Sequence, residues 1–278
     1  MRNDLGAQDT HPFPDIMGLT ERAAIGSRLM LLPRGDGFGT QIQVLLSALA
    51  YCRAQNLTYI HRPWDHVGHG PPGVQLAAWS ADLEAFTGLT QNETLFFDSL
   101  GPVPAVNYIR VKADDVDRLF NDDFLKEMRT RYLATPKNHS ESFLATKDSV
   151  RVAVHVRRGD VSQSMGSRYT SNNQTISFME RVQTDIQATD PSRSITFHIY
   201  SEGDAATFDE LMQAHGSDRV FLHLNEDLKV TFHDMTAAEV FIMAKSSFSY
   251  SAALLSTGQV YFQRSSLSPL SKWRMLPQ

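Results

Sequence analysis

The chain has 278 residues but only one cysteine, Cys52, and it has no surplus of positive charge. A single thiol excludes an internal disulfide and a zinc site built from several thiolates. The apolar residues around Cys52 predict that this thiol is packed in a helix rather than reactive. Lys and Arg number 26 against 31 Asp and Glu, a formal net charge of -5, which argues against a general nucleic-acid-binding protein.

Long apolar runs and metal-binding motifs are also missing. No apolar stretch approaches the length of a membrane-spanning helix, so we expect no membrane span in this chain. The histidines show no His-Glu-x-x-His spacing, and there is no Asp-x-Asp motif of the kind that holds a metal ion on a phosphate. We therefore predict a site that uses neither a metal ion nor a cofactor.

The signals for a cellular compartment point in two directions. The N-terminus lacks the basic-then-apolar pattern of a signal peptide. Sequences of the type Asn-x-Ser/Thr, which accept N-linked glycans in the secretory lumen, nevertheless occur at Asn56, Asn92, Asn138 and Asn173. The secretory lumen, after removal of an anchor, and the cytoplasm both remain open.

Apolar segments with strand-like and helical spacing alternate along the chain, which predicts an α/β fold. Residues 28–61 have the order strand, glycine-rich turn, helix and strand of a βαβ unit. A charged segment with helical period, residues 114–147, leads to a second alternating region that predicts a doubly wound domain. We place the boundary after Asp148, giving domains 1–148 and 149–278. In the second domain we predict strands at 150–156, 195–200, 220–222 and 241–243, and helices at 175–188, 205–214, 232–240 and 250–255.

The most informative motif is the apolar strand that ends in Arg157 and Arg158. Ligands of open α/β sheets bind at the C-terminal ends of strands, and the planar fork of arginine suits a phosphate. A second apolar run leads to Ser246, Ser247 and Phe248, where hydroxyl and backbone N–H groups at a strand-to-helix junction also suit a phosphate. Two neighbouring anion sites indicate a diphosphate ligand.

A glycine-rich loop holds a candidate general base. Gly35, Gly37 and Gly39 allow close approach of a ligand to the backbone, and Asp36 lies between them. In a cleft opposite two arginines, this carboxylate could accept a proton from an attacking hydroxyl. The alternative is that Asp36 only stabilises a turn.

The other candidates each have a structural alternative. His155 is either a core histidine or a contact to a nucleobase, and Ser201 and Glu202 either line the cleft or cap the next helix. Asp160 either contributes to the site or forms a surface ion pair. The triplets Arg34-Gly-Asp36 and Arg158-Gly-Asp160 also match the integrin-binding tripeptide. Adhesion motifs occupy exposed loop tips, however, and the second triplet directly follows a buried strand.

These motifs resemble those of the fucosyltransferase superfamily, the GT-B glycosyltransferases that include protein O-fucosyltransferases and α1,2- and α1,6-fucosyltransferases. The resemblance rests on residues 155–160, 200–204 and 237–249 in the C-terminal half, and on residues 35–41 in the N-terminal half. It implies two Rossmann-like domains that face each other across a cleft, with the acceptor on the side of domain 1–148. It also implies that domain 149–278 binds the nucleotide sugar.

The resemblance also implies roles for single residues. Arg157 would hold the β-phosphate of the donor, Asp36 would be the base, and Ser246, Ser247 and Phe248 would contact the diphosphate and ribose. Many relatives have a guanine-pairing aspartate where this chain has Thr231, and Asp234, one helical turn away, is the candidate substitute. The full predicted set is Asp36 and Arg157 as catalytic residues, with Gly37, Phe38, Gly39, His155, Arg158, Asp160, Ser201, Glu202, Asp234, Ser246, Ser247 and Phe248 as nucleotide-sugar-binding residues.

The sequence therefore predicts an inverting, metal-independent glycosyltransferase that acts on a glycan or glycoprotein. GDP-fucose is the expected donor, and a UDP-sugar such as UDP-xylose is the alternative. A non-catalytic relative that binds a carbohydrate or a nucleotide is the competing hypothesis from another class. It predicts loss of the base and the arginine, yet Asp36 and Arg157 are both present.

Overall fold

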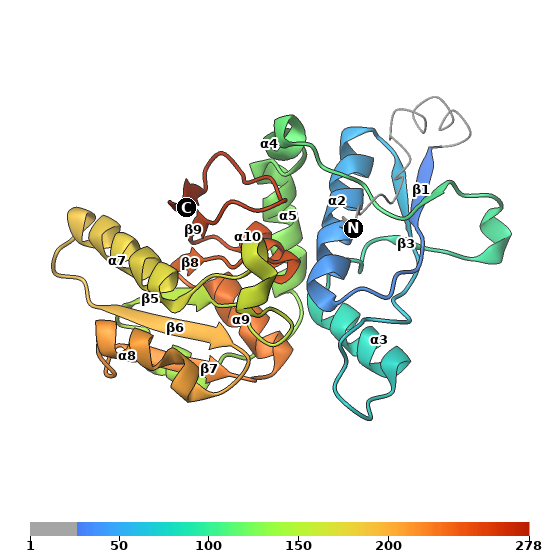
Figure 1. The fold of residues 1–278 in the computed structure, drawn as a ribbon. Coiled ribbons are helices and arrows are strands. Elements are labelled where there is room, and N and C mark those ends of the chain that lie inside the picture. Colours follow the sequence, from blue (N-terminus) through green and yellow to red (C-terminus); the bar gives the residue numbers. More distant parts are fainter. Residues whose placement is uncertain (1–26, 278) are drawn as a thin grey trace, which may run out of the picture.

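A computed structural model describes residues 27–277, which form two parallel β-sheets with helices packed on them (Figure 1). The N-terminal sheet has the order β3-β2-β1-β4, and the C-terminal sheet has the order β10-β9-β8-β5-β6-β7. This is the two-sheet α/β architecture predicted for a GT-B glycosyltransferase. The chain passes from one sheet to the other between Val106 and Val150, and the predicted domain boundary falls within that interval.

The N-terminal sheet is built around the predicted βαβ unit. It contains β1 (Arg28–Leu31), β2 (Thr58–His61), β3 (Thr94–Leu95) and β4 (Ala105–Val106). The connecting helix α2 (Phe38–Ala54) is buried along most of its length and includes Cys52, which is 2% exposed. Burial raises the pKa of the Cys52 thiol to about 12, so this side chain is the packed thiol that the sequence predicted. Helix α3 (Leu76–Thr87) follows.

The C-terminal sheet has β5 (Val150–His155) near its centre, between β6 (Ile195–Ser201) and β8 (Val240–Ile242). The even-numbered valines of β5 pack with α7 (Asn172–Thr189) and α8 (Asp209–His215), whereas Ala153 packs with the helices of the opposite face. Because both faces are covered, residues 152–154 at the centre of the strand are all apolar and buried. The remaining elements are β7 (Val220–Leu224), α9 (Leu228–Ala237), α10 (Ser247–Leu255), β9 (Gln259–Phe262) and β10 (Arg274–Met275).

The segment between the sheets is not one continuous helix. It consists of α4 (Val116–Leu119), α5 (Asp122–Leu133) and α6 (Glu141–Ala145). Asn121 starts α5, because its side chain accepts a hydrogen bond from the backbone of Phe124. Its amide also donates to the carbonyl oxygen of Arg118 at the end of α4. Helix α5 lies between the two halves in Figure 1 and packs on both α3 and α10. Its buried apolar side chains belong to a single core cluster with residues from both sheets.

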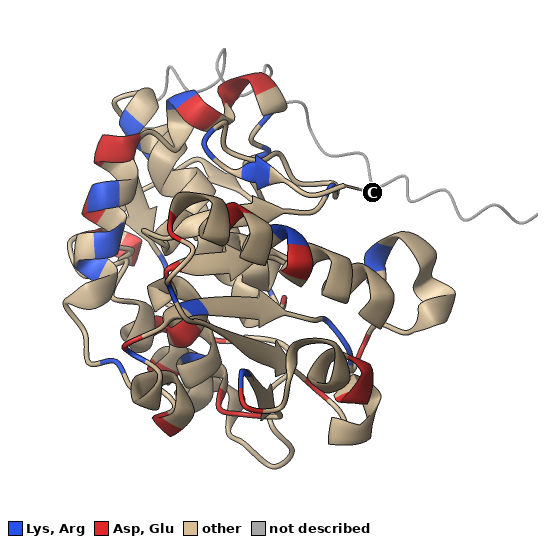
Figure 2. Cartoon of the chain, turned by 90° about the vertical axis from the view of Figure 1, so that its left-hand side faces the viewer, with Lys and Arg blue, Asp and Glu red and all other residues tan. Residues whose placement is uncertain are grey.

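Several predicted boundaries differ from the structure for local reasons. Helix α9 begins at Leu228 rather than at 232, because the Asp227 side chain accepts hydrogen bonds from the backbone of Lys229 and Val230. The strands β3, β4 and β10 have two residues each, too few for a periodic pattern. No helix of residues 27–277 has the length and apolar content needed to cross a membrane. Figure 2 shows acidic and basic residues intermixed, in keeping with the small net charge.

Candidate active site

The site lies where the C-terminal ends of β5 and β8 meet. The two strands are parallel neighbours, with Val154 paired to Ile242. Within the sheet, β5 has β6 as its neighbour in one direction and β8 as its neighbour in the other. The strand order therefore reverses between β5 and β8. A crevice at such a switch point is the usual ligand site of open α/β sheets. The topology thus brings the Arg157 motif and the Ser246 motif to one edge.

Arg157 is the more accessible of the two arginines. Its Nε and Nη2 donate to the two carboxylate oxygens of Asp160 at 3.0 and 2.6 Å. The hydrogen bond from Arg157 is the main cause that lowers the pKa of Asp160, and the charges of Arg157, Arg168 and His69 add to it. Asp160 therefore carries a negative charge that holds the guanidinium fork in one orientation.

Arg158 is a structural residue in this molecule. It is 9% exposed, and its guanidinium donates to the carbonyl oxygens of Arg157 and Thr170 and to the side chain of Asn172. The guanidinium also stacks over the ring of Tyr169, 4.5 Å from its centre. The assignment of Arg158 to the nucleotide-sugar site does not fit this environment. Its burial is also incompatible with an exposed Arg-Gly-Asp adhesion loop.

The serine motif starts helix α10. Ser246 caps the helix by accepting a hydrogen bond from the backbone of Ser249 at 3.1 Å. The hydroxyl of Ser249 in turn lies 2.5 Å from Nδ1 of His155. Burial, with a further contribution from the charge of Arg157, lowers the pKa of His155 to about 3, so the ring is neutral. The site therefore rests on a partly buried, uncharged hydrogen-bonded pair.

The glycine loop of the N-terminal half meets this motif directly. A Cβ atom placed on Gly39 would lie 2.3 Å from Cα of Phe248, so only glycine fits there. Ser251 donates to the carbonyl oxygen of Gly39 at 2.8 Å, and the rings of Phe38 and Phe248 are 6.3 Å apart. The first turns of α2 and α10 are thus in contact. Backbone N–H groups in the first turn of a helix have no partner within it, and they favour anions.

Asp36 forms an ion pair that the sequence analysis did not anticipate. Nε of Arg34 donates to Oδ2 of Asp36 at 2.5 Å, and Nη1 of Arg34 donates to the carbonyl oxygen of Asn107. Among the described residues, Oδ1 of Asp36 receives no hydrogen bond. The buried amide of Gln41 donates to the carbonyl oxygens of Arg34 and Asp36 and so fixes the loop. The spacing of Arg34 and Asp36, two residues apart, is the signal that could have revealed this pair.

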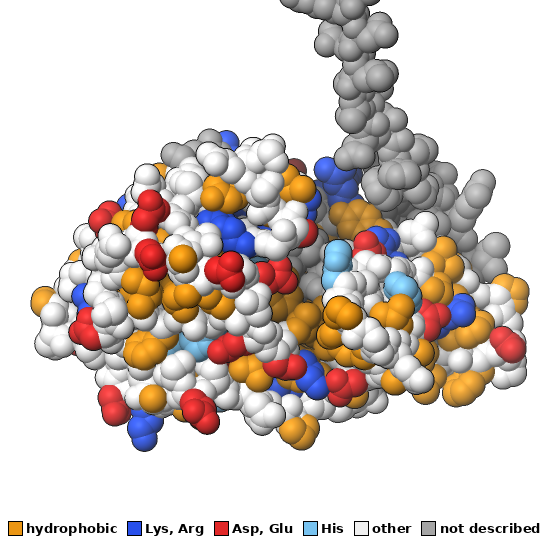
Figure 3. Space-filling view, turned by 60° about the horizontal axis from the view of Figure 1, so that its bottom comes forward, with side chains coloured by type: hydrophobic (Ala, Val, Ile, Leu, Met, Phe, Trp, Pro, Cys, Tyr) orange, Lys and Arg blue, Asp and Glu red, His pale blue; other side chains and the backbone are white. Residues whose placement is uncertain are grey.

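Two histidines that the sequence analysis considered only as metal ligands flank the same loop. Cβ atoms on Gly35 and Gly37 would lie 3.1 and 3.0 Å from the rings of His66 and His69. Gly37 and Gly68 form an isolated parallel bridge that joins the two segments. Figure 3 shows histidine side chains in pale blue on the surface of the N-terminal half. The glycines around Asp36 therefore also make room for imidazole rings.

The prediction for Asp234 was wrong. Its side chain is fully buried and accepts hydrogen bonds from Tyr200, from the backbone and hydroxyl of Ser140, and from Nδ1 of His139. All of these donors lie within 3.2 Å. The carboxylate holds the segment between the two sheets onto the C-terminal sheet, and it has no free oxygen to offer a nucleobase.

Ser201 and Glu202 lie at the same sheet edge as Arg157. The hydroxyl of Ser201 donates to the carbonyl oxygen of Val156 at 2.6 Å. Glu202 packs against Gly159, whose φ of 66° is in the left-handed region. Their roles toward a ligand remain predictions. Within residues 27–277, no three His, Cys, Asp or Glu side chains gather in an arrangement that could hold a metal ion.

Comparison with known proteins identifies a family. The model of glycosyl transferase family 11 matches residues 97–267, more than half of the chain. No curated protein sequence matches. Among solved structures, the α-1,6-fucosyltransferase NodZ from Bradyrhizobium, co-crystallised with GDP, aligns with 82% of this chain and 92% of its own at 14% identity and a TM-score of 0.43. The E. coli heptosyltransferase WaaC aligns with 90% of this chain and 92% of its own (11% identity, TM-score 0.41). POFUT1 in complex with GDP aligns with 82% of this chain and 71% of its own (12%, 0.30).

We expect the free energy of unfolding to fall as the pH decreases from about 6.5 to 5. Burial lowers the pKa of His155 and His198 to about 3 and of His233 to about 4, so the native protein keeps these rings neutral. In the unfolded chain each of these rings binds a proton near pH 6.5. Below that pH the free energy of unfolding therefore falls, by at most about 1.4 kcal/mol per pH unit for each ring. Urea unfolding at pH 7, 6 and 5 measures this slope. His198→Gln removes one of these rings and should reduce the slope. An unchanged slope would contradict the conclusion that His198 stays neutral in the native protein.

Proposed function

Since the chain belongs to glycosyl transferase family 11 and is therefore a glycosyltransferase of the fucosyltransferase type, we propose that it transfers L-fucose from GDP-fucose to a hydroxyl group. The acceptor is a glycan or a glycoprotein. The reaction inverts the anomeric carbon and needs no bound metal ion. The observation that carries this proposal is the convergence of Arg157 and the first turns of α2 and α10 on one edge of the C-terminal sheet.

The diphosphate of the donor fits this edge because three kinds of donor converge on it. Arg157 supplies a fork of N–H groups, the first turns of α2 and α10 supply backbone N–H groups, and Ser247 supplies a hydroxyl. The diphosphate competes with Asp160 for the fork of Arg157, which is bonded to both carboxylate oxygens of Asp160. As the glycosidic bond breaks, negative charge grows on the β-phosphate, and Arg157 stabilises it.

Asp36 is the general base of the proposed reaction. Oδ1 takes the proton of the acceptor hydroxyl while the hydroxyl oxygen bonds to the anomeric carbon. The bond from that carbon to the diphosphate breaks on the opposite face, and its electron pair goes to the β-phosphate oxygen. Attack opposite the leaving group inverts the configuration. The hydrogen bond from Arg34 to Oδ2 restrains the carboxylate and leaves Oδ1 for the proton.

The nucleobase is the part of the donor for which a second candidate exists. Asp234, the expected partner of guanine, is occupied within the protein, and Thr231 occupies the position at which many relatives have the aspartate. This favours a UDP-sugar such as UDP-xylose as the alternative donor. Guanine can donate two N–H hydrogen bonds to an aspartate, whereas uracil can donate only one. The family nevertheless makes GDP-fucose the first candidate.

A thermal-shift comparison of GDP and UDP separates the two donors. A nucleotide that binds only the native state raises the melting temperature, by the equivalent of about 2.7 kcal/mol at a concentration of 100 Kd. We expect GDP to give the larger shift. A larger shift with UDP would assign the donor to the uridine series, and the absence of a shift with either nucleotide would overturn the proposed function.

Replacement of Arg157 by lysine should abolish turnover. Lysine keeps the charge but not the planar fork, and the loss of one such transition-state contact costs roughly 10²–10³ in rate. Arg168→Lys is the matched control, because Arg168 also lies beside Asp160, at 3.9 Å, but its side chain is half exposed. Initial rates with GDP-fucose, measured in excess EDTA, test both variants. Near-normal turnover of Arg157→Lys would remove Arg157 from the mechanism.

Asp36→Asn should stop sugar transfer while leaving nucleotide affinity nearly unchanged. Asparagine preserves the shape of the loop but cannot take a proton at neutral pH, so we expect a loss of about 10²–10⁴ in the single-turnover rate. Calorimetric affinity for the nucleotide, measured on the same variant, separates catalysis from binding. Asp148→Asn, on the exposed surface, is the control. If Asp36 only stabilises its turn, the asparagine variant will transfer sugar normally.

A further inference from the structure

The Asn-x-Ser/Thr sequences have no part in the proposed function, and their asparagines share one property in the structure. All of them are exposed, and within residues 27–277 none of their side chains forms a hydrogen bond: Asn56, Asn92, Asn138 and Asn173. By contrast, the side chains of Asn121, Asn172 and Asn225, which lie outside such sequences, are hydrogen-bonded. The amides that could accept a glycan are therefore free to do so.

Two of these sequences present both of the groups that glycan attachment recognises, the asparagine amide and the hydroxyl two residues later. Thr58 and Thr94 are exposed, and their hydroxyls form no hydrogen bond with any residue in the described part of the chain. Asn56 lies in the turn after α2, with a φ of 54°, and Asn92 lies in the turn before β3. Exposed turns of this kind can carry a bulky, hydrophilic glycan on the surface.

The hydroxyls of the other two sequences are used inside the protein. Ser140 donates to the buried carboxylate of Asp234 at 2.7 Å. Thr175 is 2% exposed and donates to the backbone carbonyl oxygen four residues earlier, at 2.9 Å. Once the chain has folded, these hydroxyls are no longer available for recognition. Asn138 and Asn173 are therefore the weaker acceptors.

Asn56 and Asn92 lie at the same edge of the N-terminal sheet. Strands β2 and β3 are parallel neighbours, with Ile60 paired to Thr94. Each asparagine precedes its strand, so both lie beside the N-terminal ends of these strands. Ligands of open α/β sheets bind at the other edge, beyond the C-terminal ends of the strands.

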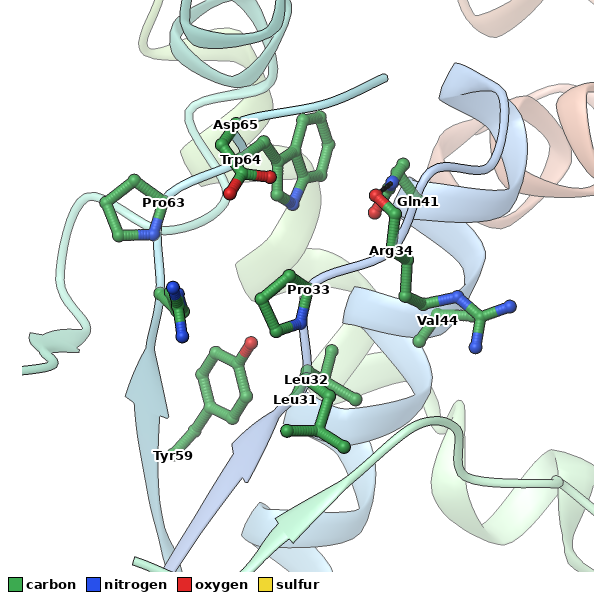
Figure 4. Close-up of a pocket in the computed structure, with 11 residues that line it drawn as sticks. Leu31, Leu32, Pro33, Arg34, Gln41, Val44, Tyr59, Pro63, Trp64 and Asp65 are labelled. Carbon is green, nitrogen blue, oxygen red and sulfur yellow. Dashed lines mark hydrogen bonds between the residues drawn. The ribbon is translucent and has the colours of Figure 1, made fainter. Parts of the chain in front are cut away.

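That other edge of the sheet carries the proposed base. Figure 4 shows the loops with Pro33 and Pro63 leaving the C-terminal ends of β1 and β2, and Asp36 lies in the first of these loops. Helix α2 begins after Asp36 and ends just before Asn56, and its 17 residues span about 25 Å at 1.5 Å per residue. Glycans on Asn56 and Asn92 would therefore leave the proposed active site open.

We propose that Asn56 and Asn92 carry N-linked glycans and that this chain passes through the secretory lumen, where such glycans are attached. The donor is an oligosaccharide joined to a lipid diphosphate. Nδ2 of the asparagine bonds to the anomeric carbon as the bond from that carbon to the diphosphate oxygen breaks. The electron pair stays on the diphosphate, and one amide proton is released. These glycans would be attached whether or not the proposed function holds.

Peptide mapping of the full-length protein from the cells that produce it tests the two sites. Peptide N-glycosidase in H₂¹⁸O converts each glycosylated asparagine to ¹⁸O-labelled aspartate. We expect the label at Asn56 and Asn92 but not at Asn107, an exposed asparagine outside any Asn-x-Ser/Thr sequence. Thr58→Val and Thr94→Val, expressed in the same cells, keep the asparagine but remove the hydroxyl. Each should lower the occupancy of its own site at least tenfold, whereas Thr58→Ser should retain the glycan.

Each outcome gives a decision. Absence of the label from either Asn56 or Asn92 in the wild type would overturn the assignment of that site, and label at Asn138 or Asn173 alone would overturn both. Nucleotide affinity, measured by calorimetry before and after glycan removal, should agree within twofold. If the glycans block nucleotide binding, their placement away from the active site is wrong. If neither form binds GDP or UDP, the proposed function fails instead, and the label still decides on the glycans.

Discussion

The contact between Gly39 and Phe248 is the constraint on which the rest of the site depends. The backbones of two helices approach so closely there that a single methyl group would collide with Cα of Phe248. One of these helices follows the loop of Asp36, and the other begins with the serine motif. This approach brings the proposed base and the proposed diphosphate site, which lie more than a hundred residues apart in the sequence, to one edge of the molecule.

Two buried carboxylates organise the regions around that contact. Asp234 holds the segment between the sheets through its bonds to His139 and Ser140, and Glu84 holds the loop of Trp64. Each accepts several hydrogen bonds, because a buried charge without partners costs several kcal/mol. Both act within the protein rather than on a ligand. A carboxylate near a predicted site is therefore a candidate ligand only when its oxygens are free, as Oδ1 of Asp36 is among the described residues.

The sequence predicted what local patterns determine. The apolar strand before Arg157 and the helix after the glycine loop follow from side-chain periodicity, and their positions agree with the structure within two residues. The sequence did not predict contacts made between distant segments. The bonds from Arg34 to Asn107 and from His139 to Asp234, and the packing of His66 and His69 on the glycine loop, depend on how the elements pack in three dimensions.

The core cluster that joins the two halves limits how this protein could change. Side chains from α2, α5, α9 and α10 pack in one continuous cluster, so the surface that unites the halves is part of the folding core. Neither half could be exchanged for that of a relative without repacking this shared core. Substitutions at exposed loop positions outside this cluster disturb the interior less. Divergence in this architecture is therefore expected to proceed by loop replacement rather than by recombination of whole domains.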